Sequence, residues 1–384
     1  MLTMAGLGFA LLVLKEPNPM QSNFVNDLMT NRRSVLKSLG AGALGGLGAT
    51  FSSNPAAAAI DNTEGGLDWG DPKDNLWAFG KIWSGYDEPV IGGFYGLMYA
   101  RIGNQRMIPL FGYEGTGCMQ CKWDPDGFLN IKSRETGYFT DLQTGEPLKH
   151  WYNPFTEETV EVYDFYNNVL GGRLGTQIPK FVMGSVGDSP TLMNEGTVFP
   201  DENGEYPFLL PFEQFGDDLL LSWDYTHDYT NPVTPEGWPK SSTGKTITPS
   251  EHFVFYVDRD EVEDRSIPTA RFRGGFSRQC NWWPWMKMGG NEYQDGIIFG
   301  RMFSQKGLPG TQSVRPKVLD YIEKHAPEFL TLPDGWPIQN DRVGTWECYS
   351  QDIPPENPNY EWTNQRKDEV IVPPTGSGAT ASAG

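Results

Sequence analysis

The chain has 384 residues, of which 38% are hydrophobic and 13% aromatic, and its formal net charge is -19. A chain of this length buries a sizeable core, as one large domain or two medium ones. So large an excess of negative charge repels phosphate backbones and anionic lipid surfaces, and we therefore expect no nucleic-acid partner.

An export signal is predicted in residues 1–59. Arg32 and Arg33 precede Ser-Val-Leu-Lys, a Gly- and Ala-rich apolar stretch follows over residues 39–51, and Ala56–Ala59 suits a small-residue cleavage site. This order resembles the bacterial twin-arginine signal; the alternative is a buried Gly/Ala helix after a basic turn. We expect residues 1–59 to be removed and the rest to be exported, already folded, by the twin-arginine machinery to the periplasm or the medium.

No stable membrane insertion is expected after processing. The apolar run over residues 7–14 is too short to span a bilayer. Because the twin-arginine route carries folded proteins, often with a cofactor bound, the signal permits a cofactor, but its identity is unknown.

Beyond residue 75 the hydrophobic pattern has mostly a period of two, which predicts strands. The predicted strands, in chain order, are LWAFGKIW (76–83), LMYARIG (97–103), QRMIPLFGY (105–113), DDLLLSWDYTHDY (217–229), EHFVFYVDRD (251–260), TARFRGGFSRQ (269–279), GIIFGRMF (296–303) and RVGTWECYS (342–350). In addition, residues 137–168 predict a meander of three antiparallel strands joined by tight turns.

One helix is predicted over residues 315–330, with Pro316 in its first turn and Pro327 ending it. About a dozen strands and one late helix predict a mainly β fold: a single large antiparallel β-barrel or a two-sheet sandwich. A lipocalin-like barrel is favoured, because several strands carry aromatic and polar side chains on one face, as a lined cavity requires. We expect one β-rich domain over residues 60–365 and a disordered tail over 366–384.

Two motifs and the export signal together carry a family resemblance. The meander FTDLQTGEPLKHWYNPFTEETVEVYDF and the segment WWPWMKMGG (282–290) look like the twin-arginine-exported proteins of domain-of-unknown-function family 1838. The resemblance spans roughly residues 75–350 and implies no established activity. The family pattern has a glycine near Glu157, where this chain departs from it.

Four cysteines are present, Cys118, Cys121, Cys280 and Cys348. Cys118 and Cys121 form a C-x-x-C in what reads as a Gly-rich loop, without the strand–helix setting of a redox motif or the second half of a zinc site. A local disulfide or two free thiols is expected, with no metal. Pairing of the other two cysteines stays open, because spacing does not fix connectivity.

Candidate catalytic residues lie on two predicted strands. Alternation from Leu219 to Tyr229 places Tyr225 and His227 on one face with Trp223, and a histidine there suits acid–base chemistry. His252 is the third candidate, although period two does not decide whether it points inward. The competing interpretation is that these groups are hydrogen-bonded core or surface residues.

Candidate binding residues come from the next segment of the chain. Arg271 and Arg273, with Arg278 close by, suit an anionic group on a ligand, or pair with the abundant acidic residues. Trp282, Trp283 and Trp285 flank Pro284, so they lie at a strand end or in a loop. They line a ligand cavity together with Trp223, or form a hydrophobic plug.

These residues leave three functions in competition, each with a small-molecule ligand or a glycan. The first is a lyase, isomerase or hydrolase that uses acid–base chemistry in an aromatic-lined cavity. The second is a non-catalytic, lipocalin-like binding protein. The third is a carbohydrate-binding surface protein with exposed tryptophans.

Overall fold

The computed structural model describes residues 66–176, 180–181, 191–192, 207–226, 228–336 and 344–362. The chain divides into two units, Met1–Ser52 and Ser53–Gly384, and every described residue belongs to the second. The predicted signal and tail therefore lie outside the described residues. Within the described ranges, no helix has the length and apolar character needed to cross a membrane.

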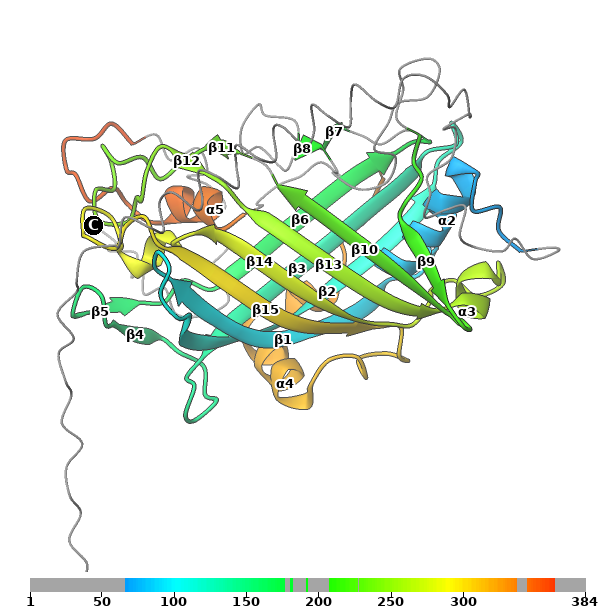
Figure 1. Ribbon diagram of the computed structural model, residues 1–384, viewed down its shortest axis with the longest axis horizontal. Helices are drawn as coiled ribbons and strands as arrows, with labels where there is room; N and C mark the ends of the chain where they lie inside the picture. Colours follow the sequence, from blue (N-terminus) through cyan, green and yellow to red (C-terminus); the bar gives the residue numbers. More distant parts are fainter. Residues whose placement is uncertain are drawn as a thin grey trace, which may run out of the picture. The chain divides into compact units, whose positions relative to one another are not determined.

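A nine-stranded antiparallel sheet forms the centre of this unit (Figure 1). Its strand order is β6-β3-β2-β1-β15-β14-β13-β10-β9. The strands are β1 (Val90–Arg101), β2 (Ile108–Trp123), β3 (Leu129–Thr140), β6 (Phe165–Leu174), β9 (Phe212–Phe215), β10 (Asp218–Thr226), β13 (Ser250–Asp258), β14 (Phe272–Asn281) and β15 (Ile297–Lys306). The mainly β prediction is confirmed. In the described residues β6 and β9 end the sheet without pairing to each other, so barrel and sandwich both stay open.

Three two-stranded sheets accompany the large one. They are β4 (His150–Asn153) with β5 (Glu158–Glu161), β7 (Lys180–Phe181) with β8 (Thr191–Leu192), and β11 (Tyr229–Thr230) with β12 (Thr246–Ile247). The predicted meander is thus partly correct, because β4 and β5 form a hairpin between β3 and β6. Its last predicted strand is divided into β5 and β6, and β6 pairs with β3.

Each long strand alternates between an inner and an outer face. The inner face is the one that carries Leu219, Phe255 and Met98, all buried. Glu135 on β3 and Glu251 on β13 both belong to it, five strand positions apart, or about 24 Å along a flat sheet. Figure 1 shows that the sheet is strongly curled, which brings distant strands closer than this flat separation, and the charge of Glu251 contributes to raising the pKa of Glu135.

Two predicted strands are helices. Residues 76–83 lie in α2 (Pro72–Trp83), which begins with Asp71 accepting a hydrogen bond from the Lys73 N–H and Pro72 in its first turn. The prediction of strand was wrong because the cap and proline are helix-start signals that outweigh a short period-two match. Residues 342–350 were also predicted as a strand, but α5 covers Thr345–Asp352 and buries Trp346 and Tyr349, three residues apart on one helical face.

The predicted late helix is confirmed. It forms α4 (Pro316–His325), ends before Pro327, and continues as a 3-10 turn, η3 (Pro327–Leu330). Both pack on the outer face of β2 and β3: the Tyr138 and Tyr321 rings lie 4.1 Å apart, and an Arg134 Nη1 donates to the Glu328 carbonyl at 3.1 Å. Outside this cover, large side chains on the outer face are exposed.

Two buried apolar clusters contain the apolar inner-face residues at opposite ends of the sheet, and the second also includes outer-face residues such as Tyr138 and Val318. One packs α2 against the ends of β2, β3 and β13, with Leu76 and Phe255 among its members. The other surrounds Trp282–Met286, at the end of β14 and in the short helix η2 (Pro284–Met286).

Lys306 fastens α2 to the sheet. Its Nζ is buried and donates to the carbonyl oxygens of Lys81 (2.8 Å), Ser84 (2.8 Å) and Ala270 (3.0 Å). Two of these carbonyls belong to the C-terminal end of α2, where the helix dipole favours a cation. These hydrogen bonds hold the C-terminal end of α2 against the inner face of the sheet.

None of the four cysteines forms a disulfide, and all four are buried. Cys118 and Cys121 lie within strand β2, not in a loop, so the local-loop expectation was wrong while the free-thiol alternative is confirmed. An odd separation along a strand turns the two side chains to opposite faces, which prevents a local disulfide. Burial raises the pKa of Cys118 to about 11 and that of Cys121 to about 12, so both thiols stay protonated and unreactive.

Candidate active site on the inner face

Three strands each place one charged side chain on an otherwise apolar inner face. On β3, Glu135 stands between Ile131 and Phe139; on β13, Glu251 precedes Phe253; on β14, Arg278 follows Phe276 by two residues. We call Glu135, Glu251, Arg278 and the neighbouring Tyr113 the inner-face cluster. Because charged groups rarely occupy apolar faces unless paired, these positions mark a site.

Glu251 and Arg278 form the fixed part of this cluster. They are direct partners across β13 and β14, with 3.1 Å between Glu251 Oε1 and Arg278 Nη1. The carboxylate side chain is 7% exposed and the guanidinium side chain 18% exposed. Burial of both groups makes the pair costly to break, since either alone would be an uncompensated charge.

Glu135 is the second carboxyl group of the cluster. Asn167 Nδ2 on β6 donates to its Oε2 at 3.1 Å, and the Gly344 N–H holds Asn167 by donating to Oδ1 at 2.9 Å. Glu135 keeps some accessible surface although protein surrounds it. Burial raises the pKa of Glu135; the bond from Asn167 opposes the rise and the charge of Glu251 adds to it.

Tyr113 supplies a neutral hydrogen-bond donor near the charged groups of the cluster, and Trp283 borders Tyr113. Burial raises the pKa of Tyr113 well above that of an ordinary phenol, against the opposing charge of Arg278. The Tyr113 ring lies 6.3 Å from that of Trp283. Trp283 Nε1 is buried and has no hydrogen-bond partner among the described residues.

Two predicted site residues lie on the inner strand β10. Tyr225 is the register partner of Glu251, and Trp223 is the register partner of Phe253. The backbone thus places both positions beside the inner-face cluster. His227 lies outside the described residues.

His252 lies on the outer face, away from this cluster. Its side chain is 48% exposed, and its Nε2 lies 3.0 Å from Ser222 Oγ and 3.4 Å from Asp224 Oδ1. The orientation follows from the burial of Phe255 and Val257, which turns the other face of β13 outward.

Arg271 and Arg273 also lie apart from the cluster. Arg271 is exposed and its Nε donates to Glu261 Oε1 at 2.6 Å, so it pairs with an acidic residue. Arg273 is an exposed outer-face residue of β14. Arg278 is the arginine of this segment that faces inward. It lies two residues before the buried Cys280 on β14, so the two side chains share a face.

The three tryptophans 282, 283 and 285 are all buried, at 0%, 3% and 1% exposure. Trp285 packs edge-on against Trp151 at 6.0 Å and lies 5.2 Å from Phe139. As predicted, they follow the end of a strand. Their packing matches the plug, with Trp283 alone bordering the inner-face cluster through Tyr113.

Glu135, Glu251, Asn167 and Tyr113 were missed from the sequence. With 49 acidic residues, no single carboxylate stands out by composition. A usable signal was present nonetheless: on three strands, the apolar face of the alternation is interrupted by one charged residue. On β13, for example, Phe253, Phe255 and Val257 share one face, and the next residue of that face toward the start of the strand is Glu251.

Two carboxyl groups held in different environments can divide acid and base roles. A carboxyl group with a raised pKa, such as Glu135, suits a proton donor, and a carboxyl group paired with a cation, such as Glu251 beside Arg278, suits a proton acceptor. Tyr113 and the Trp283 indole can donate hydrogen bonds to a substrate oxygen. In the described part of the chain, no three His, Cys, Asp or Glu side chains are grouped as a metal site requires.

Comparisons with known proteins identify a family but no activity. A search of curated proteins found no match. Among solved structures, the chain is similar to two engineered variants of the porin of Rhodopseudomonas blastica, each 9% identical, with TM-scores of 0.17 and 0.16. Each comparison covers 57% of this chain and 99% of the porin chain. TM-scores this low carry no structural conclusion.

The family model described as "Protein of unknown function (DUF1838)" matches residues 88–353, more than half of the chain. The match contains all nine strands of the large sheet and the whole inner-face cluster. The chain therefore belongs to the DUF1838 family, as the sequence resemblance predicted.

Proposed function

We propose that the protein is an enzyme that moves a proton on a small, partly apolar molecule bound at the inner face, as a lyase, isomerase or hydrolase. The observation that supports this most strongly is the convergence of Glu135 and Glu251 from strands five positions apart. Two carboxyl groups in different surroundings, one of them with a raised pKa as at Glu135, are the usual acid and base of such reactions.

In this proposal Glu135 protonates the leaving or carbonyl oxygen, and Glu251 removes the proton. Arg278 holds Glu251 in place and contributes positive charge near an anionic intermediate. Tyr225, the register partner of Glu251, is a further proton-carrying group of the proposal. His227 follows it in the same sequence alternation.

We further propose that the protein acts after twin-arginine export, in the periplasm or the medium. The support is the sequence of residues 31–59. Replacing Arg32 and Arg33 by lysine should leave the precursor in the cytoplasm. Normal export of that double variant would contradict this part of the proposal.

The enzymatic proposal is tested with the purified chain and a bacterial small-molecule extract, compared by mass spectrometry before and after incubation. The wild type should consume at least one compound, and Glu135→Gln should do so about a hundredfold more slowly, because general acid catalysis contributes on this scale. The amide keeps the size of Glu135 and its bond with Asn167. Glu158→Gln, the same change at an exposed position on β5, is the control and should match the wild type.

Two results would contradict the proposal. Equal rates for the wild type and Glu135→Gln would remove Glu135 from the reaction. A wild type that binds compounds without converting any would make the protein a binding protein.

A further inference from the structure

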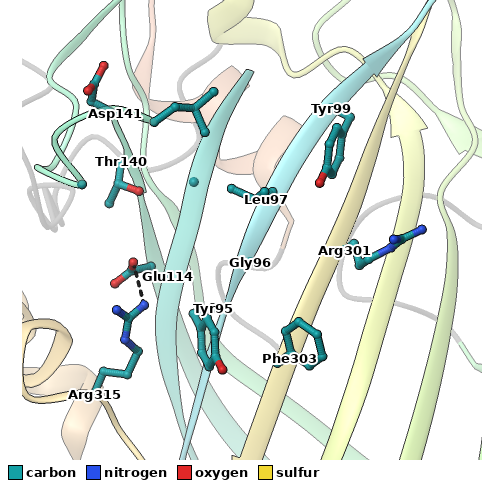
Figure 2. Close-up of a pocket in the computed structure, with 13 residues that line it drawn as sticks. Tyr95, Gly96, Leu97, Tyr99, Glu114, Thr140, Asp141, Arg301, Phe303 and Arg315 are labelled. Atoms are coloured by element: carbon teal, nitrogen blue, oxygen red, sulfur yellow. Dashed lines mark hydrogen bonds and ion pairs between the residues drawn. The ribbon is translucent and has the colours of Figure 1, made fainter. Parts of the chain in front are cut away.

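A pocket of about 340 Å³ is drawn in Figure 2. Its strand residues with side chains belong to the outer face, so it lies on the opposite side of the sheet from the inner-face cluster. Its walls come from outer-face residues of β1 and β15, from Glu114 on β2, from the turn after β3 and from Arg315. This volume is at the small end of the range for ligand sites.

Two uncovered aromatic rings form one side of the pocket. Tyr95 on β1 and Phe303 on β15 are register partners with ring centroids 5.8 Å apart. They are 42% and 57% exposed, and Figure 2 shows them next to each other. Arg315 lies over the Tyr95 ring, 4.9 Å from its centroid, which fixes one ring of the pair.

Glu114 supplies a buried acceptor that lacks a donor. The residue is 6% exposed, and its Oε1 accepts from Arg315 Nη1 and Lys317 Nζ, both at 2.9 Å. Its Oε2 is buried and has no hydrogen-bond partner among the described residues. A buried carboxylate oxygen without a donor is costly, so a ligand that donates to it would be favoured.

The charges around the pocket favour a neutral ligand. A cationic ligand would be repelled by Arg315, Lys317 and Arg301. An anionic ligand would be repelled by the unpartnered Oε2 of Glu114. Asp141 is occupied within its own turn, where its Oδ1 accepts from the backbone N–H groups of residues 143 and 144. The groups left to bind a ligand are the aromatic surface of Tyr95 and Phe303, the acceptor Oε2 of Glu114 and the Arg301 donor.

We propose that this outer pocket binds a neutral saccharide. One C–H face of a pyranose ring lies on Tyr95 and Phe303, where the negative faces of the aromatic rings meet the polarised C–H groups. A sugar hydroxyl donates to Glu114 Oε2, and Arg301 donates to another sugar oxygen. The site is separate from the inner-face cluster and does not depend on the proposed reaction.

The test uses the purified full chain and methyl glycosides of glucose, galactose, mannose and xylose, with the β-linked disaccharide cellobiose and with glucuronic acid as a charged probe. Saturation-transfer NMR should show binding of at least one neutral probe, with the strongest transfer to the C–H protons of one ring face. Tyr95→Ala and Phe303→Ala should each weaken that binding about tenfold, equivalent to 1.4 kcal/mol. Both positions are exposed, so the folded state should survive.

Tyr256→Ala is the matched control, because Tyr256 is an outer-face tyrosine outside the pocket, 55% exposed against 42% for Tyr95 and 57% for Phe303. It should bind like the wild type. The proposal is overturned if no neutral probe binds, if Tyr95→Ala and Phe303→Ala bind normally, or if Tyr256→Ala weakens binding equally. Preference for glucuronic acid over glucose would also overturn it, since the open oxygen of Glu114 would then not select the ligand.

Discussion

Trp282→Phe and Trp285→Phe form a matched pair that tests the buried tryptophan cluster. Both side chains are fully buried, so the smaller ring should cost each variant a similar packing loss, roughly 1–2 kcal/mol. The two differ in one hydrogen bond. Trp282 Nε1 donates to the Tyr293 carbonyl at 2.9 Å, whereas Trp285 Nε1 has no partner among the described residues.

This one hydrogen bond determines how far the two variants should differ in the free energy of unfolding. Trp282→Phe should lose about 1 kcal/mol more for the broken hydrogen bond, while Trp285→Phe should regain about 1–3 kcal/mol by removing an unsatisfied donor. We therefore expect Trp282→Phe to be the less stable variant by about 2 kcal/mol or more. Trp283→Phe, which also removes an unpartnered Nε1, should behave like Trp285→Phe.

Urea unfolding followed by far-UV circular dichroism measures these differences without depending on tryptophan fluorescence. The comparison holds if the three variants share one m-value. Equal destabilisation of Trp282→Phe and Trp285→Phe would refute the reasoning, because it would mean that the Trp285 donor is satisfied.

Three further stability measurements follow from single positions. Glu157 has φ 56°, and Glu157→Gly should raise the free energy of unfolding by about 1 kcal/mol because glycine tolerates the left-handed region; no gain would contradict this. A Cβ on Gly289 would lie 2.3 Å from the Ser242 carbonyl oxygen, so Gly289→Ala should cost about 1–3 kcal/mol, while Gly172→Ala, with open space around it, should be tolerated. Because the pKa of Glu135 is raised in the folded state, its contribution to stability is complete at low pH and is lost as pH rises through the folded pKa. The free energy of unfolding of the wild type should therefore fall relative to that of Glu135→Gln as the pH rises through the folded pKa. If the two free energies changed with pH in parallel, the raised pKa would be contradicted.

The sequence predicted the class of fold and most of the strands, because the period-two pattern of a half-buried sheet continues over most of this chain. It failed where a short apolar run also fits a helix. Residues 76–83 alternate well enough to suggest a strand, and the decisive signals lie just before them, at Asp71 and Pro72.

The candidate site was harder to predict than the fold. Histidine and tryptophan draw attention by rarity, yet His252 faces outward and Trp285 packs into the core. The convergence of Glu135 with Glu251 depends on how strongly the sheet curls, a tertiary property that alternation within one strand does not encode. The resemblance led us to expect glycine near Glu157, and the positive φ of Glu157 is a backbone conformation that glycine adopts readily.

The most direct test of the proposed acid–base site is a titration of Glu135 by NMR of carboxyl-labelled glutamate, with Glu135→Gln used to assign the signal. We expect Glu135 to titrate above its ordinary range, because burial and the charge of Glu251 favour the protonated form. In Glu251→Gln the midpoint should fall, since one negative neighbour is removed and the charge of Arg278 is no longer balanced. A Glu135 that titrates at or below the ordinary range would contradict its role as the proton donor.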